Sequence, residues 1–363
     1  MTRKLRIGIL FGGRSAEHEI SILSARNVAE ALDRTKFEPV LVGIDKSGRW
    51  LTQSESALLT SSRDPRLVKI NDGMAVALAP FPIASADSAA RFDVVFPVLH
   101  GPLGEDGAIQ GLLELAGIPY VGAGVLGSAI GMDKDVMKRL LVAAKIPVAK
   151  YLVVRRADYD KIPAVVSRKV AKLKFPLFTK PANLGSSVGI RRVASRRELR
   201  AALEYAFEYD VKVIAEAAIV GREIECSVLG DDAPTASLPG EIVVQHADGF
   251  YSYDAKYVDE QGATLKVPAD LDRATTKRVQ QLAIRTFQVL ECNGLARVDF
   301  FISKRGCLLV NEINTLPGFT AISMYPKLWQ ATGTTQTQLI TQLIEIAMRR
   351  HERKAHLRQS FAT

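Results

Sequence analysis

Strand-like and helix-like segments alternate along this chain, and that alternation restricts its fold more than any other feature. Leu5 to Phe11 is an apolar run of strand length, and the segment after a Gly-Gly turn carries apolar residues at helical spacing. Further apolar runs follow at Phe37 to Ile44 and at Phe92 to Leu99. Short apolar runs separated by helical segments are typical of an α/β protein rather than of a sandwich or a helix bundle. We therefore expect a Rossmann-like unit at the N-terminus.

The bulk composition is that of an ordinary globular protein. The chain has 363 residues, 47% hydrophobic and 24% charged, which leaves room for two or three domains. Its three cysteines, Cys226, Cys292 and Cys307, are widely spaced and include no Cys-x-x-Cys pair. This spacing indicates neither a disulfide framework nor a zinc site, and it fits a reducing compartment. Glycines and Arg14 interrupt the N-terminal apolar run before it reaches signal length, so we expect a cytoplasmic protein.

The net charge of +9 would suit a nucleic-acid binder. Many of the basic residues, however, lie on helix-like segments and in the tail at 349–358, where a solvated face is the simpler explanation. The sequence contains neither an aromatic-interleaved basic motif nor a zinc-finger spacing. We therefore expect no nucleic-acid partner and no membrane partner. The excess of positive charge favours anionic metabolites and nucleotides as ligands.

A glycine-rich loop at Asn183 to Gly189 is a candidate phosphate site. Its backbone amides and hydroxyls could surround a phosphate, and Lys180 stands at the end of the preceding strand-like run. The Gly-Lys-Ser/Thr order of a Walker loop is absent. A simple hairpin turn remains the alternative for this loop.

Two strand-like runs near the C-terminus, 296–301 and 308–314, each end in oxygen donors of the kind that bind hard cations. Side chains alternate along a strand, so Glu312 and Asn314 share a face while Ile313 points into the core. With Asp299 they predict a magnesium site, since carboxylates and an amide oxygen suit an ion that bridges phosphates. The alternative is a set of strand-end acids that merely face water. Arg297, on the same face as Asp299, favours a functional site.

These segments divide the chain into an N-terminal substrate domain at 1–132, a central unit at 133–212 and a C-terminal unit with the metal site at 213–363. Several short motifs, taken in order, then closely resemble the D-alanine–D-alanine ligase family. They are Phe11 to Glu19, His100-Gly101 with Gly104 to Gly107, Lys180-Pro181, Gly185 to Gly189, Gly221 to Glu223, Asp254 to Tyr257, Arg297 to Asp299, and Asn311 to Gly318.

The resemblance implies a Rossmann-like domain followed by a two-part ATP-grasp domain. It also implies ATP-dependent joining of two D-alanine molecules through an acyl phosphate, for peptidoglycan synthesis. ATP would be a co-substrate, and Asp299, Glu312 and Asn314 would hold Mg²⁺ or Mn²⁺, with two ions expected. The residues that the resemblance places around the nucleotide are Lys134, Lys180, Ser186, Ser187, Glu216, Ala217, Ile219 and Glu223. The two lysines would contact phosphates, and Glu216 and Glu223 would lie at the adenine or ribose end. Ala217 stands where many members have lysine, which leaves adenine recognition more dependent on backbone groups.

For the amino-acid substrates, the resemblance assigns Glu17 to the ammonium of the first D-alanine and His100 to its carboxylate. Arg297 and the amide of Gly318 would stabilise the oxyanion. Ser323 and Lys256 would hold the carboxylate of the second D-alanine. From the local sequence, capping or packing remain alternatives for Glu17, His100 and Ser323, and a solvated side chain remains the alternative for Lys256.

Ser186 and Tyr257 would hydrogen-bond with Glu17 and close a loop over the reactants. Tyr257 also favours the dipeptide, because family members that make the D-lactate ester typically have phenylalanine there. A D-alanine–D-lactate or D-alanine–D-serine ligase remains the near alternative. Another ATP-grasp ligase or a non-catalytic nucleotide-binding protein is more distant. The family resemblance also suggests a homodimer.

Overall fold

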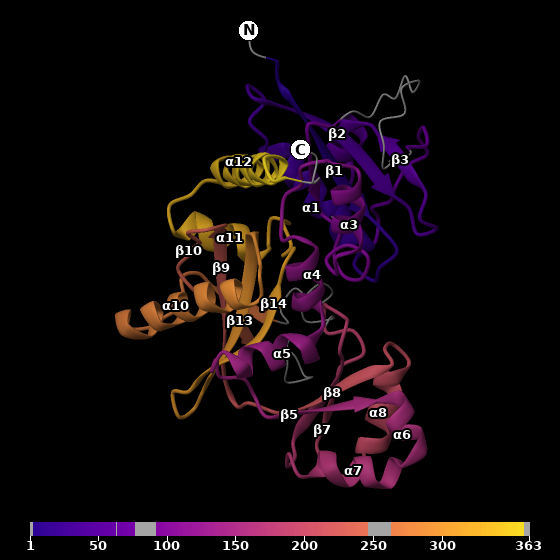
Figure 1. Ribbon diagram of the computed structural model, residues 1–363, viewed down its shortest axis with the longest axis vertical. Helices are drawn as coiled ribbons and strands as arrows, with labels where there is room; N and C mark the ends of the chain where they lie inside the picture. Colours follow the sequence, from indigo (N-terminus) through magenta and orange to yellow (C-terminus); the bar gives the residue numbers. More distant parts are fainter. Residues whose placement is uncertain (1–2, 63, 77–91, 246–262, 359–363) are drawn as a thin grey trace.

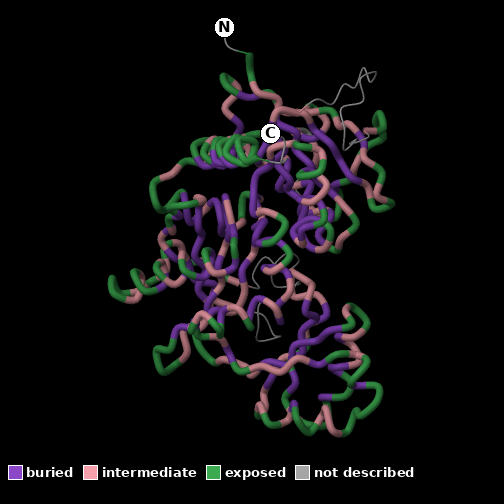
Figure 2. Tube along the Cα trace, in the orientation of Figure 1, coloured by how far each residue is buried: buried purple, intermediate pink, exposed green. Residues whose placement is uncertain are grey.

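The computed structural model describes residues 3–62, 64–76, 92–245 and 263–358. Three sheets lie in turn along the long axis of the molecule (Figure 1). The expectation of a mixed α/β protein is confirmed. Buried residues concentrate in the sheets and on the inner faces of the helices that cover them (Figure 2). Within the described residues, no helix is both long enough and apolar enough to cross a membrane.

The N-terminal sheet has the strand order β3-β2-β1-β4. Strands β1 (Leu5–Gly12), β2 (Phe37–Ile44) and β4 (Val94–Pro97) are parallel, and β3 (Trp50–Gln53) runs antiparallel to β2. The helices of this part are α1 (His18–Ala31), α2 (Glu55–Thr60) and α3 (Ala108–Leu115). The carboxyl ends of parallel strands meet at one edge of a sheet, so the segments after β1 and β4 lie together there. These segments carry Glu17 and His100.

The second sheet is antiparallel, with the order β5-β8-β6-β7. Its strands are β5 (Tyr151–Arg155), β6 (Leu177–Pro181), β7 (Arg191–Val193) and β8 (Lys212–Ala217), and its helices are α6 (Arg156–Lys161), α7 (Pro163–Ala171) and α8 (Leu199–Phe207). One face buries an apolar cluster that includes Leu177, Leu203 and Val213. The other face is left to carry polar side chains such as Lys180 and Glu216.

The third sheet has the order β12-β11-β9-β13-β14, with β10 (Thr235–Ala236) beside β9. Its other strands are β9 (Gly221–Gly230), β11 (Gly240–Val244), β12 (Ala263–Lys266), β13 (Gly294–Ser303) and β14 (Leu308–Asn314). The helices α4 (Val125–Met132), α5 (Lys134–Ala143), α10 (Arg273–Val289) and α11 (Met324–Ala331) lie around it. Met137 and Leu141 of α5 join the core beneath β13 and β14, so α5 is anchored on this sheet.

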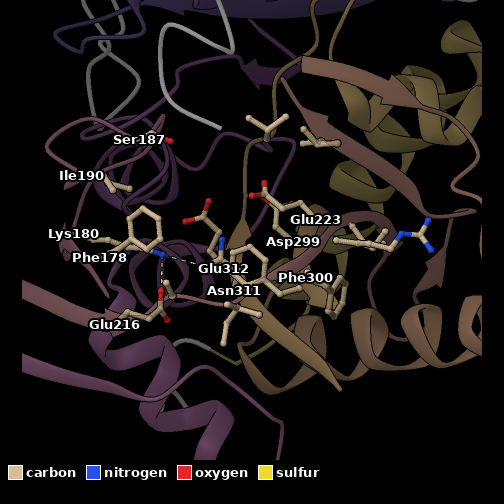
Figure 3. A pocket seen from close by; sticks show the side chains of 18 of the residues that line it. Phe178, Lys180, Ser187, Ile190, Glu216, Glu223, Asp299, Phe300, Asn311 and Glu312 are labelled. Carbon is tan, nitrogen blue, oxygen red and sulfur yellow. Dashed lines mark hydrogen bonds and ion pairs between the residues drawn. The ribbon is translucent and has the colours of Figure 1, made fainter. Parts of the chain in front are cut away.

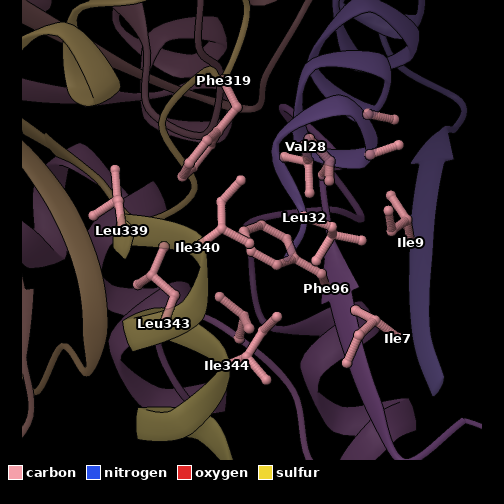
Figure 4. Close-up of a cluster of buried hydrophobic side chains, with 14 of the residues drawn as sticks. Ile7, Ile9, Val28, Leu32, Phe96, Phe319, Leu339, Ile340, Leu343 and Ile344 are labelled. Atoms are coloured by element: carbon pink, nitrogen blue, oxygen red, sulfur yellow. The ribbon is translucent and has the colours of Figure 1, made fainter. Parts of the chain in front are cut away.

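The last helix, α12 (Gln336–Ala355), returns to the N-terminal sheet. Its residues Leu339, Ile340, Leu343 and Ile344 pack in one cluster with Ile7, Ile9, Val28 and Phe96 (Figure 4). The buried Arg350 of α12 donates to the backbone oxygens of Tyr120 and Gly122, at 2.8 and 2.6 Å. The end of the chain therefore stabilises the N-terminal unit, across the limits that the sequence analysis drew at 132 and 213.

Candidate active site

Two adjoining cavities lie where the three sheets approach one another. The first, of about 480 Å³, is lined by β6, the glycine-rich loop, the end of β8 and strands of the third sheet. All the residues expected around the nucleotide line it: Lys134, Lys180, Ser186, Ser187, Glu216, Ala217, Ile219 and Glu223, together with Asp299 and Glu312. Figure 3 shows Lys180, Glu216 and Asn311 on one side and Asp299 and Glu223 on another.

The second cavity, of about 400 Å³, is lined by Glu17, His100, Arg297, Asn314, Gly318 and Ser323, all expected substrate or metal residues. Ser186 and Glu312 line both cavities. A ligand in the first cavity can therefore meet a ligand in the second at these two side chains. Tyr257 and Lys256 lie outside the described residues.

Positive charge is concentrated on the loop side of the first cavity. Lys134 is the first residue of α5, and its Nζ donates to the backbone oxygen of Leu184 at 2.6 Å and lies 3.5 Å from Glu312 Oε2. Lys180 Nζ donates to Glu216 Oε2 at 2.5 Å and to Asn311 Oδ1 at 3.3 Å. Burial alone would raise the pKa of Glu216, but Lys138 and Lys180 lower it to about 2. Glu216 is therefore a carboxylate held between lysines, and its expected role at the adenine or ribose end stays a prediction.

The glycine-rich loop is folded onto the substrate cavity. Ser186 and Ser187 have φ angles of +47° and +60°, and the Ser186 hydroxyl donates to Glu17 Oε1. A Cβ on Gly185 would lie 3.2 Å from Glu17 Oε2, so this glycine permits the close approach. Glu17 stands at the N-terminal end of α1, yet its side chain makes no capping hydrogen bond there. The Glu17 carboxylate is thus turned toward Ser186, while its place at the N-terminus of α1 keeps the helix-dipole alternative open.

The candidate metal ligands lie side by side on β13 and β14. Asp299 pairs with Glu312 and Arg297 pairs with Asn314 in the ladder, and Ile313 is buried as expected. Arg297 donates to both oxygens of Asp299 at 2.7 Å, and Asn314 Nδ2 donates to Asp299 Oδ2 at 3.0 Å. Within the described ranges, no group of three or more His, Cys, Asp and Glu side chains is arranged to hold a metal. The donors are two carboxylates and an amide, hard oxygen ligands that fit a magnesium ion retaining several waters.

Arg297 is buried among acids. Its Nε also lies 3.0 Å from Glu225 Oε2. Burial opposes the charge, but Asp299 and Glu225 raise its pKa well above the ordinary value. At the far side of the cavity, a Cβ on Gly318 would lie 2.8 Å from Ser323 Oγ. Ser323 immediately precedes α11, and its hydroxyl accepts from the backbone N–H of Thr320 at 3.0 Å rather than capping that helix.

Among the charged or polar side chains of these walls that received no role from the sequence are Glu105, Glu225 and Asn311. Burial, and then the charge of Glu17, raise the pKa of Glu105 to about 8, so it retains a proton at neutral pH. Glu105 stands within the Gly104 to Gly107 motif and Asn311 begins the Asn311 to Gly318 motif, which is the signal that could have identified both. Glu225 carries no such signal, because only pairing with β13 brings it beside Arg297.

His100 is held by two hydrogen bonds that fix its tautomer. Its Nδ1 lies 3.1 Å from the backbone oxygen of Leu316, which can only accept, so Nδ1 carries the proton and donates. Its Nε2 then accepts from the hydroxyl of Ser24 at 3.1 Å. Ser24 Oγ in turn accepts from the backbone N–H of Phe319 at 3.2 Å. His100 thus ties α1 to the segment that carries Gly318.

This arrangement predicts a pH dependence of stability. Burial lowers the pKa of His100 below its ordinary value of 6.5, despite the opposing charge of Glu17. Below about pH 6.5 the unfolded chain therefore binds more protons than the folded one, and the free energy of unfolding should fall as the pH falls toward the folded-state pKa. This residue should contribute up to about 1.4 kcal/mol per pH unit. Urea unfolding of the wild type and His100→Asn at several pH values measures the slope.

The asparagine retains a donor for the Leu316 oxygen but does not titrate. The free energy of unfolding of the variant should therefore change less steeply with pH below about pH 6.5 than that of the wild type. The exposed His356 provides the control, and His356→Asn should keep the wild-type slope. Identical slopes for wild type and His100→Asn would show that His100 is not the group responsible.

The fold and the joined cavities define a class of protein. It is a mixed α/β protein in which a cavity bordered by lysines and a glycine-rich loop adjoins a second cavity lined by an arginine and acids. The family description "D-ala D-ala ligase N-terminus" matches residues 6–123, and "D-ala D-ala ligase C-terminus" matches residues 140–345. The chain belongs to the D-alanine–D-alanine ligase family.

Individual relatives agree with this assignment. A D-alanine–D-alanine ligase of Shouchella clausii is 51% identical over 365 residues, 98% of each chain. The solved structure of a D-alanine–D-alanine ligase from Coxiella burnetii has a TM-score of 0.85 at 42% identity, covering 98% of this chain and 97% of that one. A D-Ala:D-Ser ligase from Enterococcus faecalis has a TM-score of 0.82 at 36% identity, covering 95% of this chain and 100% of that one.

Proposed function

We propose that this chain catalyses the ATP-dependent ligation of two D-alanine molecules to D-alanyl-D-alanine, which supplies peptidoglycan synthesis. The single observation that carries the proposal is the junction of the two cavities at Ser186 and Glu312. This junction would bring the end of a nucleotide triphosphate against an amino acid bound at Glu17. The family and its relatives name the substrates.

The chemistry would proceed in two displacements. The carboxylate oxygen of the first D-alanine attacks the γ-phosphorus of ATP, the bond to the bridging oxygen breaks, and ADP leaves. The amine of the second D-alanine then attacks the acyl phosphate carbon. The amine loses a proton and phosphate leaves, which gives the dipeptide.

The residues present can stabilise the negative charge that both steps create. Lys134 and Lys180 border the first cavity and would contact phosphates, while the Ser186 loop would exclude water from the acyl phosphate. Arg297 and the Gly318 amide would stabilise the oxyanion on the attacked carbon. Glu17 would bind the first ammonium, and Ser323 the second carboxylate. Asp299, Glu312 and Asn314 would hold Mg²⁺ or Mn²⁺, with two ions expected, and the metal would supply charge neutralisation of the phosphates.

We further propose that the second and third sheets form a two-part ATP-grasp domain behind the Rossmann-like N-terminal domain. Because β8 pairs within the second sheet, the limit between the two parts fits better after Ala217 than at 212. We propose that the protein is a cytoplasmic homodimer. Light scattering of the purified protein, which gives the mass of the particle in solution, tests the oligomeric state.

A D-alanine–D-serine ligase is the second candidate, because a relative with that printed specificity shares the fold at 36% identity. The relatives at 42% and 51% identity are D-alanine–D-alanine ligases by name, and this similarity supports D-alanine as the second substrate of this chain. Phosphate release with ATP and magnesium should be measured with D-alanine alone, with added D-lactate or D-serine, and with L-alanine, and the product identified by mass. Formation of the dipeptide from D-alanine alone supports the proposal. If D-alanine and D-serine or D-lactate are present at equal concentrations and the mixed product predominates, the proposal of a D-alanine–D-alanine ligase would be replaced by that of the mixed ligase.

A further inference from the structure

Lys138 is a buried lysine behind the wall of the first cavity, and the proposed function does not use it. It lies on α5, one helical turn after Lys134, and is only 1% exposed. It is absent from the residues that line either cavity. Its ammonium group is therefore screened from the cavity in this structure, and we look for its influence on a ligand in a neighbouring side chain.

That neighbour is Glu216. Lys138 Nζ lies 2.5 Å from Glu216 Oε1, while Lys180 Nζ donates to the other oxygen, Oε2, at 2.5 Å. Both lysines also reach Asn311, Lys138 at the backbone oxygen (3.4 Å) and Lys180 at the side-chain oxygen (3.3 Å). Figure 3 shows the Lys180 side of this arrangement, with its bonds to Glu216 and Asn311 dashed. One buried carboxylate therefore holds two ammonium groups.

The energetics argue against a purely stabilising role for Lys138. Taking an ammonium group out of water is costly, and an apolar side chain of similar volume often serves a buried position as well or better. Met137 and Leu141 on the same helix show that apolar packing is available to α5. A buried lysine at this position is better explained by what it does to the charge of Glu216.

The charge balance supplies that explanation. With Lys180 alone, the charge of Glu216 would be matched by a single ammonium, and little net charge would remain for an anionic ligand. With Lys138 on the far oxygen, two ammonium groups share the carboxylate of Glu216, so less of the Lys180 charge is cancelled by that carboxylate. Glu312 and Glu223 also act on Lys180, and they do so whether or not Lys138 is present. Lys180 borders the cavity and Lys138 does not, so the charge that is not cancelled is available to a ligand at Lys180.

We propose that Lys138 is a positioning residue for the nucleotide phosphates, acting through Glu216 to leave the charge of Lys180 free for them. This inference rests on the proposed use of ATP. It predicts that the loss of Lys138 weakens the binding of phosphate-bearing ligands specifically.

The test compares Lys138→Met, Glu216→Gln and the double variant. For Lys138→Met, we expect the Kd of ATP, measured by calorimetry without D-alanine, and the KM of ATP each to rise about tenfold, the effect of about 1.4 kcal/mol. The kcat at saturating ATP should change less than threefold, and the Kd of adenosine, which has no phosphate, should not change. In the Glu216→Gln background, the Lys138→Met change should alter the Kd of ATP by less than threefold, because the group through which it acts is gone.

Two controls separate positioning from general damage. Lys138→Gln removes the charge but retains hydrogen bonding, and it should reproduce the tenfold loss if Lys138→Met folds poorly. Arg350→Met removes another buried cation, one that lines neither of the two cavities, and should lower the melting temperature without changing the Kd ratio of ATP to adenosine.

An unchanged Kd of ATP in both Lys138 variants would overturn the inference. An equal loss of affinity for ATP and for adenosine would also overturn it. So would a loss of ATP affinity on Lys138→Met that is the same with Glu216 and with Glu216→Gln. Wild-type protein that neither binds ATP nor forms dipeptide would instead reject the proposed function itself.

Discussion

Replacing Arg297 by lysine is expected to lower the kcat of dipeptide formation about 100-fold to 1,000-fold, the usual effect of losing a fixed donor to a developing oxyanion. Arg297 is fixed by two parallel hydrogen bonds to Asp299, each 2.7 Å, and by Glu225 at 3.0 Å. Lysine keeps the charge but is a single point donor without the planar fork, so it cannot hold both acids and still face the cavity.

Steady-state kinetics separate this effect from substrate binding. The KM values of ATP and D-alanine should change much less than kcat, because the interaction strengthens mainly in the transition state. Arg34→Lys is a matched control, since Arg34 also makes a two-point contact with a carboxylate, Glu55, and neither residue lines either cavity. Its kcat should equal that of the wild type. A kcat within tenfold of the wild type for Arg297→Lys would remove Arg297 from the catalytic role.

Glu312→Gln is expected to lower kcat/KM for ATP about 100-fold or more, a loss of about 2.7 kcal/mol in transition-state stabilisation. Glu312 lines both cavities and lies beside Asp299 in the β13-β14 ladder. Glutamine keeps the size of the side chain but removes a negative oxygen donor. The concentration of Mg²⁺ that gives half-maximal activity should therefore rise, and a titration with Mg²⁺ at fixed ATP measures the shift.

The same variant also removes the acidic partner of Lys134, whose Nζ lies 3.5 Å from Glu312. The Mg²⁺ titration is needed to separate the loss of this ion pair from the loss of a metal ligand. If Glu312 acted only by orienting Lys134, activity would fall while the Mg²⁺ dependence stayed unchanged, and the assignment as a metal ligand would be wrong. Glu345→Gln, on the outer surface of α12, should leave both the activity and the Mg²⁺ dependence as they are.

The local sequence was sufficient to predict the placement of a side chain wherever that placement depends only on neighbours within one segment. The period of two in β14 placed Glu312 and Asn314 on one face and Ile313 in the core, because the geometry of a strand imposes that alternation. The glycine-rich loop, with Lys180 just before it, was likewise identified from contiguous residues. Each motif is short and is placed by one turn or one strand. For this reason the predicted nucleotide and substrate residues that the structure describes line the two cavities.

Partners that come from distant segments required the tertiary structure. Ser186 meets Glu17 across 169 positions, and Lys138 and Lys180 meet on Glu216 from different elements. The sequence analysis consequently gave Lys138 no role and did not identify the two lysines beside Glu216, whose expected place at the adenine or ribose end stays a prediction. It also placed the last helix with the C-terminal unit, and only the structure shows that α12 packs against both the N-terminal sheet and the third sheet.

The sequence by itself determined the α/β class, the segments that carry the chemistry and the family to which they belong. The tertiary structure alone decided which charges face one another, and hence which lysine borders the cavity and which is buried behind it. The physical reason is that periodicity reports which face of a helix or strand is buried, whereas the identity of the opposing face depends on how the elements pack. Electrostatic interactions depend on that packing through both distance and burial.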